Sequence, residues 1–324
     1  MFWTSTALSV ASLQALCFVR LAFGDTTPAS PDQIAQFVRY AKICTAVYQP
    51  NCKTPPEGIQ VLESFKNAPT DTNGWIAKDP KSNEIIVAFR GSNTLKNFGT
   101  DLTFVPVEYK SIGVEGCQGC QVHKGFLDSW NSVADQVMGT VKKQMEENKG
   151  ARLTVTGHSL GGAIASLATM SMIGSGMNVE VVTYGQPRTG NKAYADFVDS
   201  KAPEFRRVTH SNDGVPQIAL NALGFQHHST EFWQPDDKAE STVKCQGQEP
   251  KGIVSTTGLV INAAHVSYMG VQMANLPGAG VVCGEKDGLL SLNTVNTIGN
   301  FIGLPTIPQP KAVPPPKRRR FVQF

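Results

Sequence analysis

The sequence has little charge and no apolar run long enough to span a bilayer. Only 17% of its 324 residues are Asp, Glu, Lys or Arg, and 29 basic against 26 acidic residues leave a net charge of +3. This ordinary globular composition excludes wholesale disorder, a collagen-like repeat and a multi-span membrane protein. The apolar stretch at residues 7–19 is too short to cross a membrane. We therefore expect no transmembrane span.

The body of the chain also lacks several functional signatures. Residues 25–304 contain no repeat, no linker, no Asn-x-Ser/Thr sequon and no His or Cys group with zinc-finger spacing. We expect a single domain there, with no metal and no cofactor. Six cysteines remain in it, and an even count in an exported chain indicates three disulfides. Cys117 and Cys120 favour a small structural loop over a redox site, because no strand-to-helix context surrounds them.

Both ends of the chain differ from this body. Residues 1–24 indicate a secretory signal peptide, because the small residues Ala22 and Gly24 precede a suitable cleavage point at Asp25. The alternative is an uncleaved anchor, since no Lys or Arg precedes the apolar stretch. Residues 305–324 are rich in proline and contain a basic cluster, as in a disordered tail. We expect a secreted, extracellular protein.

The positive net charge comes from these ends. Removing Arg20 and the five basic residues after residue 310 leaves 29 − 1 − 5 = 23 basic residues in residues 25–310. All 26 acidic residues lie in that range, so it carries 23 − 26 = −3. A slightly acidic domain does not attract nucleic acid. We expect a monomer without a nucleic-acid partner, whose tail contacts an anionic surface, is a processing site or is simply solvated.

Short β-rich runs alternate with amphipathic helical stretches, which predicts an α/β fold with a central sheet. Ser30-Pro31 is typical of a helix start. Apolar residues recur at helical spacing from Phe126 to Met145 and predict one long helix ending near Gly150. The other expected elements are a helix at 161–173, strands at 84–90, 152–156, 179–184 and 205–210, and part of a strand or hairpin at 224–234.

The segment Gly157-His-Ser-Leu-Gly161 predicts a nucleophilic serine. It follows a predicted strand and opens a predicted helix, which is the context that a GxSxG turn requires. Side chains at Gly157 and Gly161 would collide with neighbouring backbone. The turn lifts the Ser159 hydroxyl out of the sheet and places it by the positive end of the helix.

Ser159 needs a base and an acid, and this fold places them in the chain order Ser, acid, His. Asp213 is the predicted acid, because it lies in the loop after the strand that ends at His210. His265 is the predicted general base, with His227 or His228 as alternatives. Acyl transfer also needs oxyanion donors, which we expect from the backbone N–H of Leu160 and from Ser92.

Together these motifs resemble the fungal class 3 lipases, a family that includes mono/diacylglycerol lipases and feruloyl esterases. The resemblance covers most of residues 31–285 and implies an α/β-hydrolase fold with a mostly parallel, mixed sheet flanked by helices. The similar segments are AFRGS (88–92), Cys-x-x-Cys with VHKGFLDSW (122–130), VTGHSLGGAIASL (155–167), YGQPRTGN (184–191), THSNDGVP (209–216), HHSTEFW (227–233) and AHVSYM (264–269).

The resemblance also implies a Ser159–Asp213–His265 triad and an oxyanion hole of Ser92 and Leu160. It implies a disulfide between Cys117 and Cys120, while Cys44 or Cys52 is expected to join Cys283 and Cys245 to take the other. The family's lid helix matches residues 93–101, so Asn93, Leu95 and Phe98 are the expected lid residues. Phe98 stands where tryptophan is common.

The function expected first is a secreted serine ester hydrolase, a triacylglycerol or acylglycerol lipase that acts at a lipid–water interface through an acyl-enzyme. A mono/diacylglycerol lipase and a feruloyl-type esterase are the enzymatic alternatives. A non-catalytic surface-binding protein is the alternative from another class. It is disfavoured because every triad and oxyanion position is occupied by a suitable residue.

Overall fold

The computed structural model describes residues 26–49, 52–92, 104–248, 262–273 and 283. The expected signal peptide, the expected lid residues Asn93, Leu95 and Phe98, and the tail lie outside the described residues. The predicted boundaries near residues 24 and 304 also lie outside them and stay predictions.

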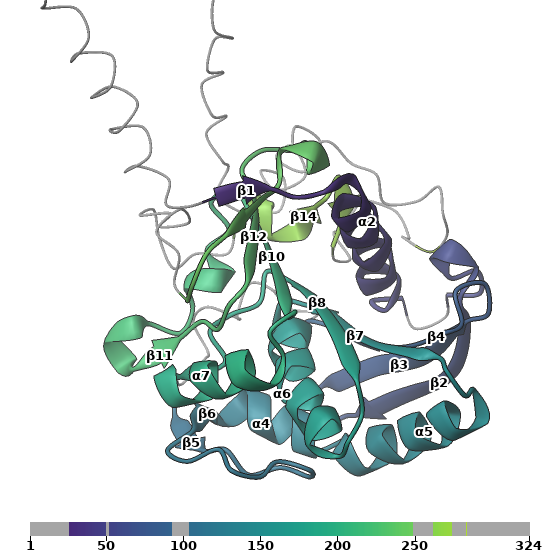
Figure 1. Ribbon diagram of the computed structural model, residues 1–324, viewed down its shortest axis with the longest axis horizontal. Coiled ribbons are helices and arrows are strands. Elements are labelled where there is room, and N and C mark those ends of the chain that lie inside the picture. Colours follow the sequence, from purple (N-terminus) through teal and green to yellow (C-terminus); the bar gives the residue numbers. More distant parts are fainter. Residues whose placement is uncertain (1–25, 50–51, 93–103, 249–261, 274–282, 284–324) are drawn as a thin grey trace, which may run out of the picture.

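Nine strands of the described chain form the main sheet, in the order β1-β13-β12-β10-β8-β7-β4-β3-β2 (Figure 1). The central strands β4, β7, β8, β10 and β12 run parallel, and the strands at both edges run antiparallel. This mixed sheet, flanked by helices, confirms the predicted α/β-hydrolase class. The bounds are β1 Thr26–Pro28, β2 Gln60–Asn67, β3 Thr72–Asp79, β4 Glu84–Phe89, β7 Arg152–His158, β8 Val179–Tyr184, β10 Arg206–His210, β12 Glu231–Gln234 and β13 Val243–Cys245.

Two small sheets and a set of helices complete the described fold. One small sheet contains β5 Pro106–Glu108, β6 Gln121–His123, β9 Gly190–Asn191 and β11 Phe225–Gln226, and the other pairs β14 Ser267–Tyr268 with β15 Val271–Gln272. The helices are α2 Pro31–Ala46, α4 Lys124–Asn131, α5 Ala134–Glu147, α6 Leu160–Gly174 and α7 Lys192–Lys201, with short 3-10 turns η1 Pro56–Gly58, η2 Val215–Gln217, η3 Asn221–Leu223, η4 Ala239–Ser241 and η6 Ala263–Val266.

The central strands of the main sheet, such as β4 and β7, are buried on both faces. Figure 1 shows α2 on one side of the sheet and α4, α5, α6 and α7 on the other. Successive side chains of β4 alternate between these layers: Ile85, Val87 and Phe89 pack in the cluster with α4–α6, while Ile86 and Ala88 pack in the cluster with α2. A strand covered on both faces has no polar side to present, which explains its continuous apolar run.

The predicted start of α2 is confirmed. The Ser30 hydroxyl accepts from the N–H of Gln33, and the Gln33 side chain accepts from the N–H of Ser30, so the two residues form a capping box ahead of Pro31.

The single helix predicted from Phe126 to Met145 is wrong, because the chain breaks between α4 and α5. The Ser132 hydroxyl donates to the Ser129 carbonyl at 2.8 Å and also contacts Thr70 Oγ1 at 2.9 Å. These bonds compete with continuation of the helix, and Val133 has φ −126°. Because neither glycine nor proline marks the break, the apolar spacing alone does not reveal it.

The segment at 224–234 contains two short strands that belong to different sheets. Strand β11 pairs with β9 in a small sheet, whereas β12 joins β10 in the main sheet. The predicted strand is confirmed as β12, and the alternative of a hairpin is wrong.

Two disulfides join described cysteines: Cys117 to Cys120, as the resemblance implied, and Cys52 to Cys283. The expected third disulfide is wrong, because Cys44 and Cys245 are both buried free thiols. Cys44 lies on α2 with its sulfur 3.1 Å from Thr156 Oγ1. Cys245 ends β13, opposite Thr26 and Glu231.

Candidate active site

Ser159 lies in a strained turn between β7 and α6, with φ 60° and ψ −128°. The predicted need for glycine beside it is met. A Cβ at Gly157 would lie 2.9 Å from the nitrogen of Gly162, and a Cβ at Gly161 would lie 2.8 Å from the carbonyl carbon of Phe89. Ser159 Oγ is buried and has no hydrogen-bond partner within the described part of the chain.

Asp213 and His265 meet in a buried pair, as the chain-order argument expects. Asp213 follows β10, and His265 lies in η6. His265 Nδ1 is 2.8 Å from Asp213 Oδ2, and both side chains are at most 1% exposed. The carboxylate accepts, so Nδ1 carries a proton, and in the neutral ring Nε2 has the free lone pair. Among the described residues, Nε2 has no partner.

Two residues that sequence reasoning missed support this pair. The Tyr268 hydroxyl donates to Asp213 Oδ2, and burial together with the Asp213 charge raises the pKa of Tyr268 well above its usual value. Gly185 has φ 52°, and a Cβ there would lie 2.9 Å from Asp213 Oδ2 and 3.0 Å from His265 Cε1. Both residues lie in motifs already noted in the sequence: Tyr268 is the tyrosine of AHVSYM, and Gly185 is the first glycine of YGQPRTGN.

The alternative bases are engaged elsewhere. His227 Nε2 donates to the Pro216 carbonyl at 2.8 Å. His228 Nδ1 donates to the Ser229 carbonyl at 2.7 Å, and its Nε2 lies 3.1 Å from the Gln186 amide nitrogen. Burial and the nearby Arg207 charge lower the pKa of His228 to about 3, and burial also lowers the pKa of His227 strongly. The histidine that the structure brings to Asp213 is His265.

The two predicted oxyanion residues line one surface hollow of about 290 Å³. Leu160 is the first residue of α6, so its N–H has no acceptor within the helix. Ser92 comes from the loop after β4, which lies against the nucleophile turn: a Cβ at Gly91 would be 2.7 Å from the His158 carbonyl oxygen. The rest of the lining is Thr70, Gly125, Phe126, Asp128 and Ser129.

Arg90 holds this loop in place, a role that sequence reasoning did not foresee. Its guanidinium donates to Asp71 Oδ1 at 2.6 Å and to the Gly91 carbonyl at 3.1 Å. In the sequence, Arg90 is the arginine of the AFRGS segment, directly before the oxyanion loop.

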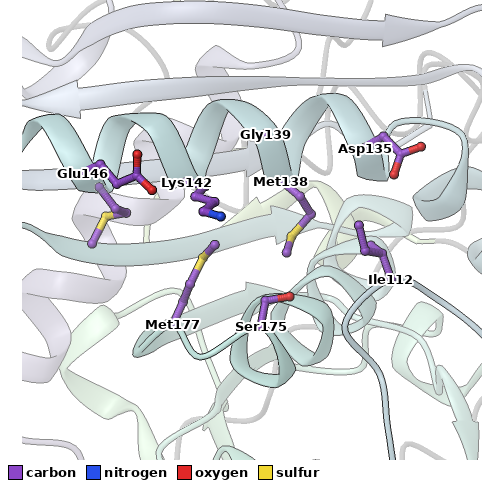
Figure 2. A pocket seen from close by; sticks show the side chains of 9 residues that line it. Ile112, Asp135, Met138, Gly139, Lys142, Glu146, Ser175 and Met177 are labelled. Atoms are coloured by element: carbon purple, nitrogen blue, oxygen red, sulfur yellow. The ribbon is translucent and has the colours of Figure 1, made fainter.

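A larger hollow has a volume of about 590 Å³, and none of the predicted site residues lines it. Figure 2 shows Met138 of α5 and Met177 pointing toward each other across it, near Ser175. Ser175 follows the last residue of α6, so at 1.5 Å per residue it lies about 22 Å from the Ser159 end of that helix. This hollow is therefore separate from the site around Ser159.

Within the described ranges, no three His, Cys, Asp or Glu side chains are grouped so that they could hold a metal ion. No helix in those same ranges combines the length and the apolar character needed to cross a membrane.

Comparisons with known proteins agree on one family. The pattern described as "Lipase (class 3)" matches residues 86–222. The chain is 33% identical over 223 residues to the lipase of Rhizomucor miehei, covering 67% of this chain and 60% of that protein. It is 34% identical over 258 residues to the secreted mono- and diacylglycerol lipase A of Penicillium cyclopium, covering 73% of this chain and 82% of that protein.

A solved structure described as "A serine protease triad forms the catalytic centre of a triacylglycerol lipase" superposes on this chain with a TM-score of 0.69. The sequences are 30% identical, and the match covers 77% of this chain and 98% of that one.

Proposed function

This chain belongs to the class 3 lipase family, and from that premise we propose that it is a secreted serine hydrolase that cleaves acylglycerol esters at a lipid–water interface. The observation that carries the proposal is the buried His265–Asp213 pair beside the strained Ser159 turn. Ser159 Oγ can donate a proton and His265 Nε2 can accept one, and each is buried without another partner among the described residues. Catalytic hydrogen bonds are often open in a free enzyme and tighten only with substrate.

In the proposed first step, Ser159 Oγ attacks the ester carbonyl carbon while His265 Nε2 takes the hydroxyl proton. Asp213 holds the ring by its Nδ1–H and stabilises the imidazolium that forms. The negative oxygen of the tetrahedral intermediate accepts from the Leu160 N–H and from Ser92. Loss of one such donor typically costs roughly 100- to 1000-fold in rate.

The intermediate collapses when the alcohol leaves with the proton from His265, and Ser159 remains acylated. Water then attacks the acyl carbonyl while His265 takes one of its protons. That proton returns to Ser159 Oγ as the fatty acid leaves, so the enzyme is restored. All the proposed residues come from one chain, which is consistent with action as a monomer.

The test of this proposal compares Ser159→Ala with Ser166→Ala. Ser166 lies on α6, the helix that Ser159 precedes, and its hydroxyl is 2.7 Å from Tyr194 Oη, so the second variant controls for loss of a buried serine. We expect Ser159→Ala to lower hydrolysis of a short-chain nitrophenyl ester by several orders of magnitude, and Ser166→Ala to retain it. Unchanged activity of Ser159→Ala would refute the mechanism.

A mono- and diacylglycerol preference is the second candidate, favoured by the 34% identity to the Penicillium cyclopium enzyme. Hydrolysis of triolein, diolein and monoolein emulsions separates the two. Rates with triolein at or above those with the partial glycerides support the triacylglycerol assignment, and negligible rates with triolein support the second candidate. Secretion is tested by the N-terminal sequence of protein recovered from the medium, which we expect to begin at Asp25.

A further inference from the structure

His158, which precedes the proposed nucleophile, has both ring nitrogens in buried hydrogen bonds. The side chain is 0% exposed. Its Nε2 lies 2.7 Å from the backbone carbonyl oxygen of His265, and its Nδ1 lies 2.8 Å from Tyr48 Oη. A carbonyl oxygen only accepts, so Nε2 carries the proton and donates. Nδ1 is then left to accept from the Tyr48 hydroxyl, which fixes one neutral tautomer.

Tyr48 extends this chain of hydrogen bonds to the loop that carries Ser92. Its hydroxyl oxygen accepts from the backbone N–H of Gly91, the residue before Ser92. A side chain at position 91 would overlap that hydroxyl, so the close approach needs glycine. The buried bonds therefore run from the Gly91 N–H to Tyr48 and from Tyr48 to His158. From His158 they reach the His265 carbonyl.

The segment that carries His265 is held at three successive carbonyls. His210 Nδ1 lies 3.2 Å from the Ala264 oxygen, His158 Nε2 holds the His265 oxygen, and the Met273 N–H donates to the Val266 oxygen at 3.0 Å. The His158 and His265 rings also lie with their centroids 4.5 Å apart. Burial lowers the pKa of both His158 and His210, so they serve as neutral donors.

We propose that Tyr48 and His158 are positioning residues of this reaction, which fix the backbone of the His265 segment against the Ser159 turn and the Ser92 loop. The proposal rests on the proposed function. Neither side chain needs to touch substrate. Their bonds set where His265 Nε2 stands relative to Ser159 Oγ, and displacement of a catalytic group by about 1 Å can cost about 100-fold in rate.

A pair of amide substitutions separates the two bonds of His158. In His158→Gln the side-chain amide reaches the position of Nε2 and can still donate to the His265 carbonyl. In His158→Asn the shorter amide reaches only the position of Nδ1, so it keeps Tyr48 and loses His265. Tyr48→Phe removes the link between Gly91 and His158. Tyr109→Phe is the control, because Tyr109 Oη donates to the Leu167 carbonyl at 3.0 Å and is also buried.

We expect His158→Asn and Tyr48→Phe to lower kcat for a nitrophenyl ester roughly tenfold or more with KM unchanged within about twofold, since displacement of His265 acts on the chemical step and not on substrate binding. His158→Gln keeps the bond to the His265 carbonyl and loses the bond to Tyr48, so it should recover part of kcat. Tyr109→Phe should match the wild type. The proton NMR signal of the His265 Nδ1–H bonded to Asp213 should shift or broaden in the first two variants only.

Ser159→Ala in the same assay keeps the two proposals apart. No hydrolysis by the wild type, or full hydrolysis by Ser159→Ala, would overturn the proposed function and this proposal with it. Hydrolysis that is lost in Ser159→Ala but kept in His158→Asn and Tyr48→Phe would overturn the positioning roles alone. Equal losses in Tyr109→Phe and His158→Asn, or no recovery in His158→Gln, would also overturn them.

Discussion

Replacing His228 with glutamine should make the folded state less sensitive to mild acid. Glutamine keeps an amide that can bond the Gln186 side chain or the Ser229 carbonyl, but it does not titrate. The wild-type ring is buried against Phe205, at 4.2 Å between ring centroids, and burial with the Arg207 charge lowers its pKa to about 3. In the unfolded chain a histidine has an ordinary pKa of about 6.5.

The sign and size of the effect follow from these two values. At pH 8 both states are neutral at this position, so the site makes no pH-dependent contribution. Below pH 6.5 the unfolded chain takes up a proton that the folded chain refuses, and stability falls. At pH 5 the loss relative to pH 8 is about 2 kcal/mol, or roughly 30-fold in the folding equilibrium constant.

The assay is urea unfolding at pH 8 and pH 5 for the wild type, His228→Gln and Phe205→Leu. The wild type should lose about 2 kcal/mol more than His228→Gln between the two pH values. Phe205→Leu disturbs the same contact without removing a titrating group, so its loss should match the wild type. Equal pH dependence of wild type and His228→Gln would refute the buried, neutral state of this histidine. The lowered pKa values of His158, His210 and His227 act in the same direction and are common to all three proteins.

Two further perturbations test other parts of the structure. Gly185→Ala should lower ester hydrolysis by about 100-fold, because the added Cβ would lie against Asp213 and His265. Gly176→Ala is the control: Gly176 has φ 86°, and an added Cβ would have no atom within 4 Å, so this variant should retain activity in the same assay. Removing the Cys52–Cys283 disulfide, with a sequence separation of 231, should destabilise the fold by about 5 kcal/mol, against about 1.6 kcal/mol for Cys117–Cys120 with a separation of 3. Comparing the denaturant midpoints of Cys52→Ser and Cys117→Ser checks this order, and equal losses would contradict it.

The nucleophile turn was predictable because its requirements are local. A strand, two glycines that avoid backbone collisions and a helix start all lie within Arg152–Gly174, and the structure places each of them as expected. The contact between Asp213 and His265 was predictable for a different reason. In a parallel sheet the loops after the strands meet at one edge. Chain order therefore left only a few residues as candidates for the acid and the base.

The failures concern contacts between distant segments. An even number of cysteines predicted a third disulfide, but Cys44 packs under β7 and Cys245 ends β13, which lies between β1 and β12. The Ser132 hydroxyl at the helix break contacts Thr70, which lies 62 residues away. Local periodicity indicates which face of an element is apolar, and it does not indicate which remote side chain reaches that face.

The roles of the histidines follow from what each ring nitrogen contacts. His158, His210, His227 and His228 each have a ring nitrogen in hydrogen-bond contact with a backbone carbonyl oxygen, and burial lowers the pKa of all four. Such rings serve as neutral structural donors. Within the described residues, His265 is the histidine whose ring meets a buried carboxylate, at 2.8 Å from Asp213, while its other nitrogen keeps an unused lone pair. A buried carboxylate on one nitrogen and an unpartnered second nitrogen suit the general base of the proposed reaction, and two of the other histidines, His158 and His210, contact backbone carbonyls of the segment that carries His265.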